Sequence, residues 1–184
     1  MAGRRSEQCQ ALFISLSMYI GFRTPKSLAG VCMKIVLMSI KPRFAEEILT
    51  GVKRFELRAG SGIASGYRVI LYASAPIKAV VGEFTSGSVI IGSYEEVEEF
   101  MRSISVTGVS NEDFSYIRGK KRRVMAIEVL NPIKYCNPIS LEELRRLGLR
   151  NPPRSYQFLS LDNPVHKRII EAVNRLSKCG EIAI

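Results

Sequence analysis

The chain has only one histidine and four widely spaced cysteines, and these shortages limit the metal sites that it can form. A single histidine, His166, cannot supply a histidine-rich site. The cysteines show none of the close paired spacings that zinc sites and redox motifs use; they are Cys9, Cys32, Cys136 and Cys179. We therefore expect no metal and no other cofactor. A disulfide between two of these cysteines is an alternative, as in proteins from hot environments. Their scattered positions, however, favour a reducing compartment and a cytoplasmic protein.

The apolar-rich stretch near the start of the chain is too short to cross a bilayer as an ordinary helix. It covers residues 11–22 and follows Arg4 and Arg5, in the manner of a signal peptide. Residues 24–28, however, contain no clean small-x-small cleavage site. We expect no membrane association.

Acidic residues are scarce relative to basic ones. The 17 Asp and Glu face 27 Lys and Arg, which gives a formal net charge of +10. Such a charge attracts polyanions and favours nucleic acid as a partner, although it is also compatible with a merely basic, soluble protein. A length of 184 residues with 46% hydrophobic content fits one domain with one core.

The domain is expected to begin at Met33, which opens directly onto a strand-like apolar run that ends at Ile40. Residues 1–32 differ in character and are predicted to be an N-terminal extension, either flexible or the product of a misassigned start. Residues 33–184 then form the domain. The extension contains four basic residues and one acidic residue, so most of the positive charge belongs to the domain.

The domain combines short strands with short helices. Alternating or continuous apolar runs predict strands over 35–40, 53–58, 68–74, 77–85 and 124–130. Capping boxes begin two of the helices, at Ser93 and Ser140. Helices are expected over 42–50, 94–104, 110–117, 141–147 and from Pro164 to a stop at Gly180. This mixture predicts an α+β fold with a β-rich barrel or sandwich.

The segment from Ser39 to Arg58 resembles the signature of the ASCH family, a PUA-like group. A strand ending in Ser-Ile-Lys-Pro is followed by a helix that closes at Gly51 and by a Gly-x-Lys-x-x-Glu-x-Arg strand. Further similarities lie at residues 82–84, 119–128 and 152–156. The resemblance spans about residues 34–160 and implies a small, archaeal-type ASCH protein. Its implied fold is a PUA-like β-barrel with flanking short helices.

The resemblance implies RNA binding, in RNA metabolism or transcription-coupled regulation, with RNA or a nucleotide held in a basic cleft. Lysines and arginines there would contact phosphates, a buried Glu56 would accept hydrogen bonds from a base edge, and Tyr156 would offer a stacking surface. Alternatively, Glu56 pairs with Lys53 or Arg58 and only stabilises the barrel. The predicted nucleic-acid-binding residues are Lys41, Arg43, Lys53, Glu56, Arg58, Lys120, Lys121, Arg154, Ser155 and Tyr156.

An enzymatic alternative follows from the same resemblance. Some small ASCH proteins are amidohydrolases that remove acyl groups from modified cytidine, with the Gly-x-Lys lysine, a threonine three residues later and a glutamate. This chain keeps Lys53 but has Glu56 in place of the threonine. If it is an enzyme, the candidate catalytic residues are Lys53, Glu56 and Glu83. A helix-turn-helix DNA regulator is disfavoured, because helix 141–147 lacks a partner helix at the tight spacing of that motif.

Overall fold

The structure is a computed structural model and describes residues 33–104, 107–119 and 123–181. The chain divides into two compact units, Met1–Met33 and Lys34–Ile184, and all the described helices and strands belong to the second. The extension predicted over residues 1–32 lies outside the described residues, as do Lys120 and Lys121.

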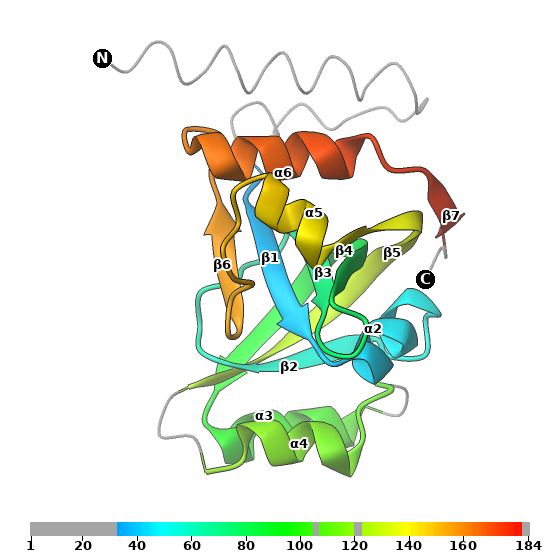
Figure 1. The fold of residues 1–184 in the computed structure, drawn as a ribbon. Helices are drawn as coiled ribbons and strands as arrows, with labels where there is room; N and C mark the ends of the chain where they lie inside the picture. Colours follow the sequence, from blue (N-terminus) through cyan, green and yellow to red (C-terminus); the bar gives the residue numbers. More distant parts are fainter. Residues whose placement is uncertain (1–32, 105–106, 120–122, 182–184) are drawn as a thin grey trace, which may run out of the picture. The chain divides into compact units, whose positions relative to one another are not determined.

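A single curled sheet of seven strands forms the centre of the second unit (Figure 1). The strands are β1 (Ile35–Ile40), β2 (Phe55–Ala59), β3 (Arg68–Ala73), β4 (Ala79–Gly92), β5 (Val124–Ser140), β6 (Tyr156–Leu159) and β7 (Lys178–Glu181). Six of them follow the order β2-β5-β4-β3-β1-β6, and β7 pairs with β5. The β1–β3 pair is parallel and the other pairs are antiparallel.

Among the residues that the structure describes, five short helices flank the sheet, as the sequence predicts. They are α2 (Pro42–Leu49), α3 (Tyr94–Ser103), α4 (Asn111–Ile117), α5 (Leu141–Arg146) and α6 (Pro164–Asn174). The capping boxes predicted at Ser93 and Ser140 are both formed, and the helices after Lys41 and Asn163 each begin with proline. These local signals place the helix starts correctly because a capping box satisfies backbone N–H groups that the helix cannot pair internally, and a proline at the first position has no N–H group to pair.

The alternation of side chains along the strands divides the core into three clusters. Met38 and Leu71 belong to the cluster on one face of the sheet, which packs against α2. Leu37, one residue away on β1, belongs to the opposite face, which α5 and α6 cover. Leu57 lies in a third cluster beneath α3 and α4. Successive residues of a strand therefore contact different helices, which is the expected result of their pointing to opposite faces.

The predicted last helix is too long. It ends at Asn174 rather than at Gly180, and residues 178–181 form β7, which is linked to β5 by a Cys136–Cys179 disulfide. The sequence favoured reduced thiols, and for these two cysteines that expectation is wrong. Their separation of 43 residues gave no signal, because only the pairing of β7 with β5 brings them together.

Strand β5 joins the strand predicted over 124–130 to the residues that follow it, and it runs through two prolines to Ser140. Pro132 follows Asn131, whose φ of 48° marks an irregularity where the register with β4 shifts. A proline is tolerated at a bulge because no regular ladder hydrogen bond is needed from its nitrogen.

The described strands form a curled half-barrel, so the β-barrel implied by the family resemblance is confirmed only in part. Among the described strands, no hydrogen-bonded ladder joins β2 to β6, the two ends of the sheet order. Strand β6 covers only four residues and pairs with β1 no further than Met38, so the carbonyl of Ser39 is left for another donor. The Nη2 of Arg58, on β2, donates to that carbonyl at 2.7 Å. A side chain therefore bridges the gap that main-chain pairing leaves open.

Within the described part of the chain, no helix combines the length and the apolar character needed to span a bilayer.

Candidate functional site

Helix α2, the start of β2 and helix α4 converge on the buried side chain of Lys53. This residue is 0% exposed. Its Nζ contacts Asp113 Oδ1, lies 3.1 Å from Glu56 Oε2, and stands 4.2 Å from the centre of the Phe44 ring. A buried ammonium group is tolerated only when it is paired, and here two carboxylates and an aromatic face surround it.

Asp113 holds helix α4 and Lys53 together. Its Oδ2 accepts hydrogen bonds from both the backbone N–H and the hydroxyl of Ser110, each at 2.8 Å, while Oδ1 contacts Lys53. One carboxylate oxygen thus stabilises the start of the helix and the other neutralises a buried cation. The position of Lys53 therefore depends on a helix that is 60 residues away in sequence.

Arg58 continues this network toward the gap between the sheet ends. Its Nε lies 2.9 Å from Glu56 Oε1, and its Nη2 binds the Ser39 carbonyl. Glu56 therefore lies between Lys53 and Arg58, with one oxygen toward each. The side chain of Arg58 is 15% exposed, so the network reaches solvent here.

Three buried polar atoms in this region have no hydrogen-bond partner among the described residues: Glu56 Oε2, Arg58 Nε and Ser39 Oγ. The two atoms at Glu56 and Arg58 are within ion-pair distance of opposite charges, but those contacts lack hydrogen-bond geometry. Leaving a buried polar group unsatisfied costs roughly 1–3 kcal/mol. Such groups are uncommon in native proteins, and these three lie on contacting residues beside the gap between the ends of the sheet.

The predicted cations at the rim, Lys41 and Arg43, are exposed but paired with acidic residues. Arg43 contacts Glu47 and Glu112, both at 2.8 Å. Lys41 contacts the hydroxyl of Tyr116 and lies 4.3 Å from its ring centre, with Glu112 at 4.0 Å.

The region is consequently not a concentration of uncompensated positive charge. Its four cations are matched by four carboxylates, and α4 supplies two of these together with Tyr116. Sequence reasoning missed the contribution of α4. Asp113 follows Ser110 at the spacing of a capping box, so the sequence suggests only that it stabilises the start of its own helix. No sequence pattern shows which cations that helix faces in the folded protein.

The remaining predicted binding residues lie on or just before β6. The backbone carbonyl of Ser155 accepts a hydrogen bond from Ser39 N at 2.9 Å, and Arg154 is exposed. The Tyr156 hydroxyl lies only 2.8 Å from where a Cβ at Gly62 would be, so the loop after β2 can approach this tyrosine closely only because glycine is there. The structure therefore places Ser155 and Tyr156 beside the same gap that Arg58 bridges.

Glu83, the third candidate catalytic residue, is not brought to Lys53. It faces the side of the sheet covered by α5 and α6, where it binds Arg68, with 2.7 Å between its Oε2 and Arg68 Nε, and contacts the hydroxyl of Tyr135. Burial raises the pKa of Tyr135 well above its ordinary value of 10.0, and the neighbouring Glu83 carboxylate raises it further.

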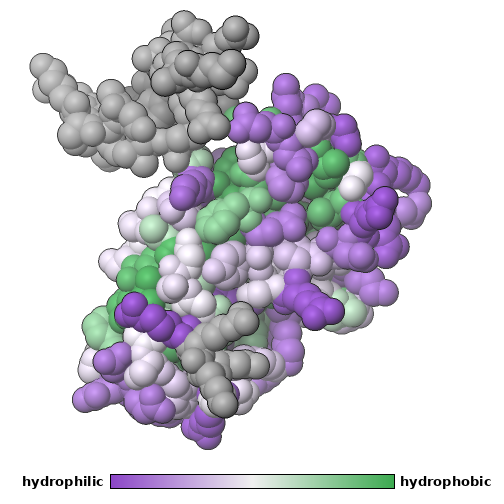
Figure 2. Space-filling view, turned by 90° about the vertical axis from the view of Figure 1, so that its left-hand side faces the viewer, coloured by the Kyte–Doolittle hydropathy of each residue, from purple (hydrophilic) through white to green (hydrophobic). Residues whose placement is uncertain are grey.

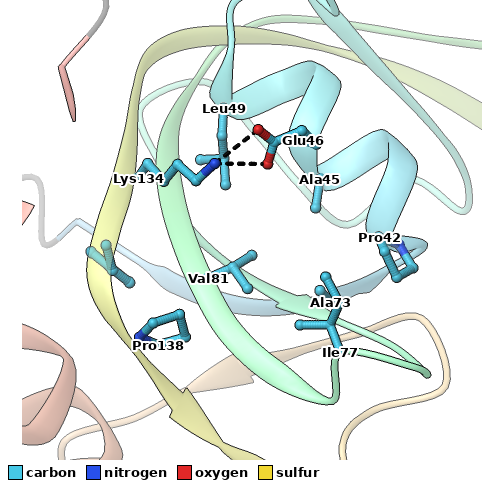
Figure 3. Close-up of a pocket in the computed structure, with 10 residues that line it drawn as sticks. Pro42, Ala45, Glu46, Leu49, Ala73, Ile77, Val81, Lys134 and Pro138 are labelled. Atoms are coloured by element: carbon cyan, nitrogen blue, oxygen red, sulfur yellow. Dashed lines mark hydrogen bonds and ion pairs between the residues drawn. The ribbon is translucent and has the colours of Figure 1, made fainter. Parts of the chain in front are cut away.

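A separate pocket of about 220 Å³ lies beside α2, as Figure 3 shows. Its walls are mostly apolar, and an ion pair between Glu46 and Lys134, with distances of 2.8 and 3.0 Å, crosses its rim. Sequence reasoning did not identify this pocket, because it is formed by segments that are distant in the chain. In the described residues, no group of three or more His, Cys, Asp or Glu side chains is arranged to hold a metal ion.

Comparison with known proteins identifies the fold. The crystal structure of ASCH from Zymomonas mobilis matches with a TM-score of 0.63 and 23% sequence identity, over 78% of this chain and 96% of that chain. Two mutant forms of the same Zymomonas mobilis protein match with the same TM-score at 22% identity, over 97% and 99% of their chains. No family model matches the chain, and no curated protein does. The chain has the fold of the ASCH domain, while nothing in these matches supports the predicted archaeal type.

Proposed function

We propose that this protein, whose fold is that of the ASCH domain, binds RNA or a nucleotide at the gap between the ends of its sheet. The observation that carries the proposal is the set of unsatisfied polar atoms on Ser39, Glu56 and Arg58. A nucleobase edge offers hydrogen-bond donors and acceptors side by side, so it can satisfy a carboxylate oxygen and a guanidinium N–H together. The net charge of +10 supports an anionic ligand.

Each part of the site has a role in this proposal. Glu56 accepts a hydrogen bond from the base, and Arg58 donates one. Arg43 and Lys41 lie at the rim, where a phosphate would replace Glu112 as their partner. Because these exposed ion pairs are worth only about 0–1 kcal/mol, exchanging a carboxylate for a phosphate costs little.

Binding is favoured over amide hydrolysis by the placement of the candidate catalytic groups. Glu83 contacts Arg68 and Tyr135 on the opposite face of the sheet from Glu56, and a carboxylate occupies the position of the nucleophilic threonine in the similar amidohydrolases. Lys53 is enclosed by Glu56 and Asp113 and is positioned to hold the site together.

The test is a fluorescence-anisotropy titration of labelled structured RNA at several salt concentrations, with a matched pair of variants. Arg43→Ala and Arg146→Ala each remove an exposed arginine that pairs with a glutamate one helical turn away, but only Arg43 lies at the site. We expect Arg43→Ala to weaken binding and to reduce the slope of log K against log salt by roughly one, as the loss of one phosphate contact requires. Arg146→Ala should leave both unchanged.

A second variant tests base recognition. Glu56→Gln keeps the shape of the side chain but replaces one acceptor oxygen by a donor, so affinity should fall while the salt slope is retained. Circular dichroism and thermal unfolding confirm that each variant is folded. If Arg43→Ala and Arg146→Ala weaken RNA binding equally, the attraction between the protein and RNA depends on total charge alone. The proposed site would then be wrong.

A further inference from the structure

Three aromatic rings form a continuous row beside the site, here called the aromatic strip: Tyr67, Phe158 and Tyr156. The rings of Tyr156 and Phe158 are 6.0 Å apart with an interplanar angle of 85°, and those of Phe158 and Tyr67 are 6.1 Å apart at 78°. Tyr67 and Tyr156 are partly buried against the core, which fixes the position of the strip. Phe158, in the middle, is 41% exposed.

A cation accompanies these rings. The Nζ of Lys34 lies 5.5 Å from the centre of the Tyr67 ring and 5.7 Å from that of Phe158. Of the carboxylates that the structure describes, none forms an ion pair with Lys34. Figure 2 views the unit from the side of β6 and shows hydrophobic surface exposed among hydrophilic residues on this side.

The strip is continuous with the site at the sheet gap. Tyr156 and Phe158 are two residues apart on β6, opposite Met38 and Val36 of β1, so both side chains lie on the same face of the sheet. The hydrogen bond from Ser39 N to the carbonyl of the residue before Tyr156 joins the end of the strip to the segment that Arg58 contacts.

We infer that the aromatic strip binds the bases of single-stranded nucleic acid that extends from the site, and that it makes the protein selective for single strands. The inference rests on the proposed function. An exposed ring beside a lysine without a carboxylate partner suits a ligand that is both flat and anionic, whereas an apolar peptide would gain nothing from Lys34. In a duplex, the base faces are stacked on one another, so the strip has nothing to bind.

The experiment compares binding of a short labelled single strand and of the matching duplex to the full chain. Phe158→Ala is paired with Phe100→Ala, because Phe100 on α3 is 40% exposed and therefore matches Phe158 in residue type and exposure. We expect Phe158→Ala to weaken single-strand binding by roughly 5- to 150-fold, as the loss of one base–aromatic stack implies, with an unchanged salt slope. Phe158→Tyr should retain binding, Phe100→Ala should have no effect, and neither phenylalanine should affect the duplex.

The outcomes separate this inference from the proposed function. If single-strand binding requires Arg43 but is indifferent to Phe158, the proposed site stands and the aromatic strip is only packing. If the unaltered protein binds neither strand nor duplex, the inference about the aromatic strip is wrong, and a titration with a labelled nucleotide then decides whether the proposed function stands. If it binds no strand while a labelled apolar peptide is held in a Phe158-dependent manner, the strip belongs to a protein partner and the inference fails.

Discussion

Replacing Lys53 by Met should destabilise the protein far more than the loss of an ordinary surface lysine. The substitution removes the ammonium group that neutralises two buried carboxylates, Glu56 and Asp113, and only Arg58 remains to compensate them. Removing one partner of a buried pair costs roughly 3–5 kcal/mol, since an uncompensated charge is left in a region of low dielectric constant. Glu56 and Asp113 are each only 3% exposed, so solvent screens their charge poorly. The loss is a large share of the ~5–15 kcal/mol that stabilises a typical domain.

A second substitution should restore most of this stability. Asp113→Asn in the Lys53→Met background removes the surplus negative charge but keeps a side-chain oxygen for Ser110, so the double variant should lose much less than the two single variants added together. Urea unfolding followed by circular dichroism gives each free energy and its m-value. Glu112→Gln on the same helix is the control, because its exposed ion pair with Arg43 is worth only about 0–1 kcal/mol. A loss below about 1 kcal/mol for Lys53→Met, or additive effects of the two substitutions, would refute the reasoning.

Three further predictions concern other parts of the molecule. Cys136→Ser should lower the free energy of unfolding by about 4 kcal/mol, the chain-entropy value for a disulfide that closes a 43-residue separation, and reductant should have the same effect on the unaltered protein in urea unfolding. The raised pKa of Tyr135 means that the native state retains a phenol proton that the unfolded state loses above about pH 10, so stability should fall with rising pH there; Tyr135→Phe should make the fall shallower in urea unfolding from pH 8 to 11. Gly82→Ala should cost roughly 1–3 kcal/mol in thermal unfolding, because its Cβ would lie 2.4 Å from the carbonyl oxygen of Ile133; a variant as stable as the parent would contradict this close packing.

The sequence predicts most of the fold, since the dominant signals are local. Proline at the first turn of α2 and α6, together with the capping boxes at Ser93 and Ser140, locates helix starts that the structure confirms. Strand β1 is predicted correctly from its apolar run. The errors occur where distant segments decide the outcome. Strand β7 exists because it pairs with β5, and nothing in residues 178–181 alone distinguishes it from a continued helix.

The site was predicted only in part for the same reason. Lys53, Glu56 and Arg58 are close in sequence, and the structure places them in direct contact. Their electrostatic environment, however, depends on α4. The basic cleft was expected from the family resemblance and from the cations on and near α2, whereas the carboxylates of Glu112 and Asp113 come from a segment about 60 residues later. Charge counted along a chain does not show which charges face one another in the folded state.

The double role of Asp113 also limits how this fold can be shortened. Helices α3 and α4 lie between β4 and β5, where a smaller version of the domain could have a short loop instead. Deleting them would remove the counter-ion of Lys53 as well as the cover of the sheet, and the ammonium group would be left facing only Glu56, which Arg58 already contacts. A trimmed domain would therefore lose one of the two carboxylate partners of Lys53 together with part of the cover that keeps this lysine buried, so α4 supports the charge network as well as the sheet.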